Sequence, residues 1–237
     1  MPELPEVESI RRVLKNSLIN QKLEKYKIFD QRINRFNTVN PRNLGVLLEI
    51  YRKGKILQFN FKNNSIFFHL GMSGRLDLNG IKNKHTHGIF FFDEDVLHYD
   101  DIRKFGYIKI LKNDLANKQF AILGPDALSL SKLDKIFVMN KAKKSSTSIK
   151  KFLLDQKNIS GLGNIYVNEI LFLAGIHPHS VSFKLKDTNW NDIFLYTKKV
   201  LKKAIKNNGT TLSDMTYVLP QGVYAVSYTH LTLPTKA

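Results

Sequence analysis

Apolar residues recur at helical spacing near the start of the chain and throughout its second half. Ile10, Val13, Leu14 and Leu18 fall on one face of a helix over residues 9–20. The same periodicity marks four later segments, near residues 131–140, 148–156, 164–174 and 190–206. This pattern predicts one helix that packs on the first half of the chain and a second half that is mainly helical.

From about residue 44 to residue 111 the pattern changes to short runs rich in aromatic and β-branched residues. ILQFNF and SIFFHL flank an Asn63-Asn64 turn, and GIFFF and VLHY flank an acidic turn. Two hairpins are therefore expected, and YIKIL at 107–111 continues the same texture. Together the patterns predict an α+β fold, in which an N-terminal β-sandwich or barrel with flanking helices precedes a helical domain.

The change of periodicity places a domain boundary near residue 130. We expect a β-sandwich domain over 1–130, a helical domain over 131–225 and a separate tail over 226–237. The total of 237 residues is enough for two domains. The basic run KAKK at 141–144, with the Ser/Thr run after it, is typical of a solvated loop.

The charge of the chain indicates a polyanionic partner. Lys and Arg number 37 against 20 acidic residues, a net charge of +17, and such an excess attracts nucleic acid. Solvated lysines spread over the surface for no specific purpose would give the same count. A hydrophobic content of 43% is enough for real cores, and no apolar run reaches the roughly 18 residues of a membrane span, so we expect a soluble chain without a membrane partner.

Cysteine is absent from the sequence, which excludes a cysteine-ligated zinc site within these residues. With no charged-then-apolar leader at the N-terminus, this composition is compatible with a cytoplasmic protein. The KHTH stretch has the spacing of a metal-binding pair, but no further ligand follows nearby. We therefore expect no metal and no cofactor in this chain.

The opening MPELPEVE has two interpretations. Proline followed by glutamates suits the first turn of a helix, because proline lacks an N–H and acids complement the helix dipole. Alternatively, removal of Met1 would make Pro2 a terminal secondary amine beside carboxylates. An α-amino group has a reference pKa of about 7.7–8.0, so an appreciable fraction is neutral and nucleophilic near pH 7.

Three further motifs bear on this choice: HLGMSG at 69–74, DIRKFG at 101–106, and DQKNISGLGNIYVNEILFLAGIHP at 155–178. With PELPEVE, and in this order, they closely resemble the formamidopyrimidine-DNA glycosylases, bacterial base-excision repair enzymes that remove oxidised purines. The resemblance covers residues 2 to about 224. It implies a monomeric cytoplasmic glycosylase and AP lyase that acts on damaged double-stranded DNA and carries a helix–two-turn–helix DNA-binding element.

The resemblance also implies the catalytic groups. Pro2 matches the nucleophile that forms a Schiff base with C1′, an electron sink that allows β(δ)-elimination to follow. Glu3 matches the general acid/base, and Glu6, one turn further on, would be a second carboxylate near it. Lys55, in RKGKIL, matches a lysine that contacts the damaged site and assists elimination. Without the resemblance, Lys55 is typical of a solvated strand-end lysine.

An enzyme that excises a base takes it out of the stack, and side chains inserted between base steps fill the gap. The resemblance assigns this intercalation to Met72, Arg103 and Phe105. The glycines beside Met72 and after Phe105 are typical of tight turns whose tips project. The family usually has Arg-Arg where this chain has Arg103-Lys104, which weakens the expectation of a bidentate phosphate contact at the second position.

Further DNA contacts follow from the same resemblance. Asn164 matches a residue that contacts the DNA backbone near the lesion, and Lys150 matches a further DNA contact. The GLGN turn before an apolar helix is a ready phosphate site. His85 and Arg103 match two more contacts; the competing interpretation of His85, which is the less favoured, is a hairpin-loop histidine without a role. The GTTLSDM stretch at 209–215 matches the segment that covers the flipped base.

The resemblance ends near Tyr224. Members of the family normally continue into a hairpin held by four zinc-bound cysteines, and AVSYTHLTLPTKA contains none. We expect residues 226–237 to be a non-native tail, or a short strand through Val226, Tyr228 and His230. Loss of the finger that grips phosphate would leave a folded protein with poor or absent excision.

Two alternative functions remain. Endonuclease VIII-like glycosylases share the fold and the N-terminal proline but act on oxidised pyrimidines. They typically open with PEGPE, with Gly where this chain has Leu4, so the purine branch is favoured. The other alternative is a basic module that binds damaged DNA without cutting it.

Overall fold

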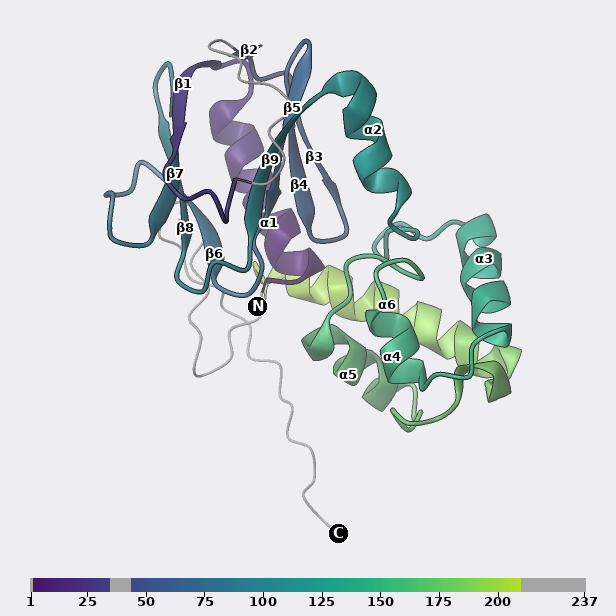
Figure 1. Cartoon of the computed structure of the whole chain (residues 1–237). Helices are drawn as coiled ribbons and strands as arrows, with labels where there is room; N and C mark the ends of the chain where they lie inside the picture. The colour runs from purple at the N-terminus through teal and green to yellow at the C-terminus, as the bar shows by residue number, and fades with distance from the viewer. Residues whose placement is uncertain (1, 35–43, 210–237) are drawn as a thin grey trace. The chain divides into compact units, whose positions relative to one another are not determined.

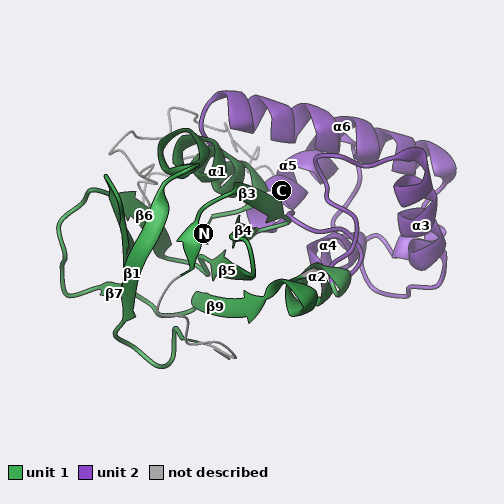
Figure 2. Ribbon diagram, turned by 90° about the horizontal axis from the view of Figure 1, so that it is seen from above, with its two compact units in different colours: residues 1–122, 218–224 green, residues 123–217, 225–237 purple. Residues whose placement is uncertain are grey.

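The computed structural model describes residues 2–34 and 44–209 (Figure 1). They fall into two compact units: the first ends at Ile122 and the second begins at Leu123 (Figure 2). This boundary precedes the predicted one at residue 130. Hydrogen bonds account for the difference, because the segment after Ile122 pairs with the loop before α5, through Gly124 N to Gln156 O and Ser160 N to Pro125 O, both 2.8 Å.

Helix α1 (Leu4–Leu18) opens the first unit and begins five residues earlier than the apolar periodicity indicated. Its start is fixed by Glu3, which caps the helix, and by a proline in the first turn. The predicted apolar positions Ile10, Leu14 and Leu18 are buried, as are Leu4 and Val7. The helix is therefore held by the core of the unit along its whole length.

Two antiparallel sheets follow, as the strand patterns predicted. One sheet has the order β2-β1-β7-β8-β6, built from Gly45–Val46, Lys22–Ile28, Thr86–Phe92, Val96–Asp101 and Gly74–Leu78. The other has the order β3-β4-β5-β9, built from Glu49–Lys53, Ile56–Asn60, Asn64–His69 and Tyr107–Lys112. Both predicted hairpins, β4–β5 and β7–β8, are confirmed.

The two sheets pack face to face through aromatic side chains. The ring of Phe68 on β5 lies 5.2 Å from that of Phe90 on β7 and 6.2 Å from that of Tyr99 on β8, centroid to centroid. Phe59 on β4 meets Phe68 edge-on at 4.9 Å. All four rings are buried, so they form the centre of the predicted β-sandwich.

Helix α2 (Asn113–Ala121), which the sequence patterns did not predict, packs on β5 and β9 and ends the first unit. The second unit contains α3, α4, α5, a short 3-10 turn η1 and α6, at Lys132–Lys143, Ile149–Leu154, Asn164–Leu173, Ser182–Lys184 and Asp187–Lys206. The four predicted helical segments are thus confirmed. The KAKK run is largely helix rather than loop, because α3 continues to Lys143.

Trp190 on α6 organises the core of the second unit. It is 2% exposed, and its ring lies 5.8 Å from that of Phe152 on α4 and 5.7 Å from that of Phe194. None of the helices in the described ranges combines the length and the apolar character that crossing a membrane requires.

Candidate active site

The N-terminal segment buries a proline and two carboxylates at the start of α1. Pro2 is buried, and Glu3 and Glu6 are only 1% and 3% exposed. The backbone N–H of Glu3 donates to Glu6 Oε2 at 2.9 Å, and the Glu3 side chain accepts from the backbone N–H of Glu6. Both interpretations of the opening therefore hold together: the capping box that starts the helix also fixes two carboxylates beside Pro2.

Lys55 occupies the turn of the β3–β4 hairpin. Lys53 pairs with Ile56, so only Gly54 and Lys55 make the turn, and Gly54 has a φ of +58°. Burial lowers the pKa of Lys55, and the negative charges of Glu3 and Glu6 oppose this effect only in part. The first unit therefore brings together the four predicted catalytic groups, with a lysine that loses its proton more readily than a solvated one.

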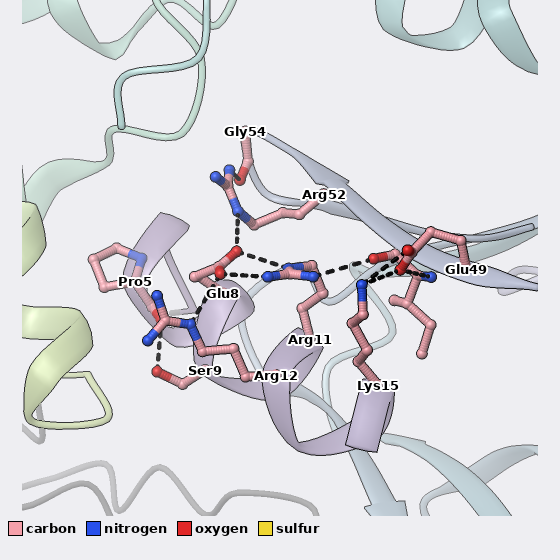
Figure 3. Close-up of polar contacts among 10 residues, drawn as sticks. Pro5, Glu8, Ser9, Arg11, Arg12, Lys15, Glu49, Arg52 and Gly54 are labelled. Atoms are coloured by element: carbon pink, nitrogen blue, oxygen red, sulfur yellow. Dashed lines mark hydrogen bonds and ion pairs between the residues drawn. The ribbon is translucent and has the colours of Figure 1, made fainter. Parts of the chain in front are cut away.

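A buried glutamate connects the two elements that carry these groups (Figure 3). Glu8 on α1 accepts hydrogen bonds from Arg11, Arg12 and Arg52, at 2.8 to 3.1 Å. Arg52, whose side chain is 6% exposed, also donates to the carbonyl oxygen of Gly54 at 2.9 Å. Glu8 thus connects the first turns of α1 to the turn that presents Lys55.

The charge of Glu8 is stabilised by its partners. Burial alone would raise its pKa, but hydrogen bonds and charge from Arg11 and Arg52 outweigh that effect and lower the pKa from 4.5 to about 2. Sequence reasoning assigned no role to Glu8 or Arg52. The only hint in the sequence was that Glu8 is the third glutamate of PELPEVE. Its partner Arg52 lies 44 residues away, so the pair could not be predicted from local sequence.

The predicted intercalating residues lie on two adjacent turns of the first unit. Met72 is half-buried in the turn between β5 and β6, and Arg103 and Phe105 are exposed between β8 and β9. The Arg103 guanidinium lies 4.7 Å from the Phe105 ring centroid. The turns touch so closely that a Cβ on Gly71, whose φ is +58°, would lie 2.5 Å from the backbone N of Gly106.

Lys104, which stands where the family usually has a second arginine, forms an ion pair within the protein. Its Nζ lies 2.8 Å from Asp30 Oδ2, and its backbone adopts a left-handed φ of +56°. Hydrogen bonds from Arg32 and Lys104 hold the pKa of the Asp30 carboxyl well below its usual range. The positive charge at position 104 is thus already paired within the protein.

The remaining predicted DNA contacts lie in three other places. His85 is half-buried in the turn before β7, where its backbone N–H donates to Asn83 Oδ1 at 2.8 Å. Lys150 is half-buried on α4, in the second unit. Asn164 is the exposed first residue of α5, after a turn that Gln156 braces by accepting from the N–H of Gly161 at 2.8 Å.

Some predictions fall outside the described residues. These are the segment expected to cover a flipped base, apart from Gly209, and the tail over 226–237. A zinc ion held by four cysteines does not fit this sequence, which has no cysteine. Within 2–34 and 44–209, no three His, Asp or Glu side chains are grouped to bind a metal ion.

Family comparisons cover both units. The description "Formamidopyrimidine-DNA glycosylase N-terminal domain" matches residues 1–108, and "Formamidopyrimidine-DNA glycosylase H2TH domain" matches residues 123–216. Curated formamidopyrimidine-DNA glycosylases from Psychromonas ingrahamii and Listeria innocua are each 35% identical to the chain. The alignments cover 90% and 94% of this chain and 82% and 84% of those proteins.

Solved structures of the Lactococcus lactis protein agree with this chain in fold. A complex with DNA that contains an abasic site has a TM-score of 0.82 at 32% identity, over 91% of this chain and 82% of that one. A mutant in complex with Fapy-dG-containing DNA has a TM-score of 0.85 at 31% identity, over 94% and 85%. The motifs, the two matched domains and these relatives together show that the chain belongs to the formamidopyrimidine-DNA glycosylase family of base-excision repair enzymes.

Proposed function

We propose that this protein excises oxidised purines, 8-oxoguanine and formamidopyrimidines, from double-stranded DNA and then cleaves the strand as an AP lyase. The observation that carries the proposal is the buried cluster at the start of α1, where Pro2 adjoins Glu3 and Glu6 and their charges act on Lys55. Titratable groups gathered in this way are typical of a site that moves protons.

The first step is substitution at the sugar. With Met1 removed, the lone pair of the Pro2 nitrogen forms a bond to C1′, the bond from C1′ to the base breaks, and its electrons leave with the base. The base takes up a proton, and the Pro2 nitrogen loses its own. Because α-amino groups have a reference pKa of about 7.7–8.0, far below that of lysine, an α-amine nucleophile needs no strong base to become reactive.

Ring opening and elimination follow. The bond from C1′ to O4′ breaks as Glu3 donates a proton to O4′, which leaves a cationic imine between Pro2 and C1′. This imine withdraws electrons, so a base can remove a C2′ proton and the 3′-phosphate departs. Lys55, whose pKa is lowered by burial, is suited to assist this proton removal.

The partner in this proposal is damaged duplex DNA. The net charge of +17 supports attraction to the phosphate backbone, and the related Lactococcus lactis structures are complexes with damaged DNA. Met72, Arg103 and Phe105 would fill the space of the flipped nucleotide, while His85, Lys150 and Asn164 would contact the backbone. The enzyme would act as a monomer in the bacterial cytoplasm.

Borohydride trapping tests the mechanism. The full chain is incubated with duplexes that contain 8-oxoguanine, an oxidised pyrimidine or an abasic site, and the imine is reduced to a stable covalent adduct. We expect adducts with 8-oxoguanine and abasic duplexes, and none when one extra residue precedes Pro2. Glu3→Gln should slow trapping about a hundredfold or more, whereas Glu24→Gln, at an exposed position on β1, should not change it.

Two results would contradict the proposal. Adducts with the oxidised pyrimidine but not with 8-oxoguanine would place the protein with the endonuclease VIII-like enzymes. Binding of damaged duplex in a gel-shift assay without any adduct would indicate a recognition module that does not cut.

A further inference from the structure

A single buried carboxylate joins the two turns that carry the predicted intercalating residues. Asp101, the last residue of β8, is 0% exposed. Its Oδ1 accepts from Ser73 Oγ at 2.6 Å and from the backbone N–H of Arg103 at 3.2 Å. Its Oδ2 accepts from the backbone N–H of Gly106 at 2.8 Å. One donor comes from the Met72 turn and two come from the turn of Arg103 and Phe105.

Ser73 forms a second link between the two turns, directly to the backbone of Arg103. While its hydroxyl donates to Asp101, the same oxygen accepts from the backbone N–H of Arg103 at 2.9 Å. We call Asp101, Ser73 and the backbone N–H groups of Arg103 and Gly106 the Asp101 clamp. Hydrogen bonds to a charged acceptor are stronger than those between neutral groups, so the clamp resists separation of the turns.

Backbone packing reinforces the clamp. A Cβ on Gly106 would lie 2.4 Å from the carbonyl oxygen of His69 and 1.9 Å from Tyr99 Oη, and Tyr99 Oη in turn donates to that same carbonyl at 3.1 Å. Together with the contact between Gly71 and Gly106, this leaves no room for a side chain between the two turns. The turns are therefore fastened by both hydrogen bonds and steric fit.

The side chains of Arg103 and Phe105 are exposed, in contrast to the buried hydrogen bonds that fix the backbone of the two turns. Phe105 is 52% exposed, and the Arg103 guanidinium stacks on its ring. Transfer of the exposed Phe105 ring from water into the gap between base pairs would bury apolar surface, which is favourable in free energy. Insertion is favoured further when the backbone is already in place, because less conformational freedom is lost on binding.

We propose that Asp101 is a positioning residue that fixes the Met72 turn to the Arg103–Phe105 turn, so that the three side chains enter the vacated base position as one unit. The inference rests on the proposed function, since only an enzyme that flips a nucleotide needs such a unit. Asp101 touches no substrate atom in this account and acts through the two turns.

The test uses two clamp variants of the full chain and one control. Asp101→Asn keeps the size of the side chain but directs an amide NH₂ at donors that need an acceptor. Ser73→Ala, at a half-buried turn position, removes the hydroxyl with little risk to folding. Ser65→Ala is the matched control, because Ser65 lies at the other end of β5 and its buried hydroxyl bonds to Gln58, Asn60 and Asn113 rather than to the turns.

The readout is fluorescence of 2-aminopurine placed beside a tetrahydrofuran abasic analogue in duplex DNA, which increases as the neighbouring stack opens. Trapping rates are measured in parallel on an abasic duplex and on a single-stranded abasic oligonucleotide, which has no stack to enter. We expect Asp101→Asn to weaken the fluorescence change and lower the duplex trapping rate about tenfold. Ser73→Ala should act in the same direction with a smaller effect, and the double variant should be less than additive.

The single-strand rate separates the clamp from the chemistry. It should be unchanged in both clamp variants and in Ser65→Ala. Unaltered fluorescence and duplex rates in both clamp variants would overturn the proposal, as would equal losses on single and double strands. Absence of trapping by the unmodified protein on both the duplex and the single strand would instead refute the Pro2 mechanism, while the binding fluorescence would still report on the clamp.

Discussion

The two units of this protein differ in what they bury. Among the described residues, every buried carboxyl and imidazole side chain belongs to the first unit: Glu3, Glu6, Glu8, His87, His98, Asp100 and Asp101. Within residues 123–209, the buried side chains of the second unit that carry a polar group are the uncharged ones of Ser160, Tyr166, Ser182, Trp190 and Thr197. Burying a charge costs free energy unless it is paired and hydrogen-bonded. The first unit therefore has to compensate the desolvation of buried charges, whereas the second unit does not.

The carboxylates of the first unit are compensated in ways that also position functional groups. Glu6 accepts from the helix start beside Pro2, Glu8 holds Arg52 against the Lys55 turn, and Asp101 holds the two turns together. The second unit instead carries its charge in water, with exposed lysines along α6 at Lys198, Lys199, Lys202, Lys203 and Lys206. Buried charge fixes geometry, whereas solvated charge supplies attraction to a polyanion.

The largest expected effect is on stability at Glu8. Glu8→Gln removes the negative charge that faces the buried Arg52, so we expect the first unit to lose about 3 kcal/mol of unfolding free energy. Urea denaturation followed by hydrogen–deuterium exchange of peptides from the sheets measures the first unit. The single tryptophan, Trp190, reports separately on the second unit and should show a smaller change.

Glu24→Gln is the control for that experiment, since Glu24 is exposed and should leave both transitions unchanged. A loss below about 1 kcal/mol in Glu8→Gln, the range of exposed ion pairs, would mean that the arginine cluster is not a buried ionic contact in solution. The contrast between the units would then lose its main support.

Acid should remove the same stabilisation without any substitution. The folded pKa of Glu8, about 2, lies below its ordinary value of 4.5, so its contribution is complete above pH 4.5 and is lost as the pH falls towards 2. The stability difference between the natural chain and Glu8→Gln should therefore narrow between pH 5 and pH 2. A difference that stays constant over this range would show that the Glu8 carboxylate is not the source of the effect.

A smaller effect is expected at the N-cap of α3. Ser131 accepts from the N–H of Asp134 at 3.1 Å, and the Asp134 carboxylate accepts from the N–H of Ser131 at 2.9 Å. Ser131→Ala should cost the second unit about 1 kcal/mol, which is typical of a lost cap. Trp190 fluorescence during urea denaturation measures this loss, and a larger shift in the sheet signal than in the tryptophan signal would contradict it.

The smallest effect is expected where the second unit buries a hydroxyl. Thr197 Oγ1 donates to the carbonyl oxygen of Ile193, one turn earlier in α6, at 2.7 Å. Thr197→Val keeps the shape and removes a bond that the helix does not depend on, so we expect a change of about 0.5 kcal/mol or less. A loss as large as that of Glu8→Gln would show that both units rely equally on buried polar groups.

Sequence patterns predicted most of the fold because local periodicity reports directly on which face of an element is buried. They missed β1 and α2: the strand alternates with lysines and the helix has weak periodicity. The motifs indicated the groups around Pro2, but not the contacts that hold them. Glu8 and Arg52 are 44 residues apart, and Ser73 and Asp101 are 28 apart, so only the folded chain pairs them.

The β3–β4 hairpin also limits how this chain can change over evolution. Its turn consists of only two residues, Gly54 and Lys55, because Lys53 pairs with Ile56. An insertion here would shift the Lys55 amine relative to Pro2 and the start of α1, while the opposite end of β4 is not constrained in this way. Length variation among natural homologues should therefore accumulate in the β4–β5 connection and be absent from the turn that contains Lys55.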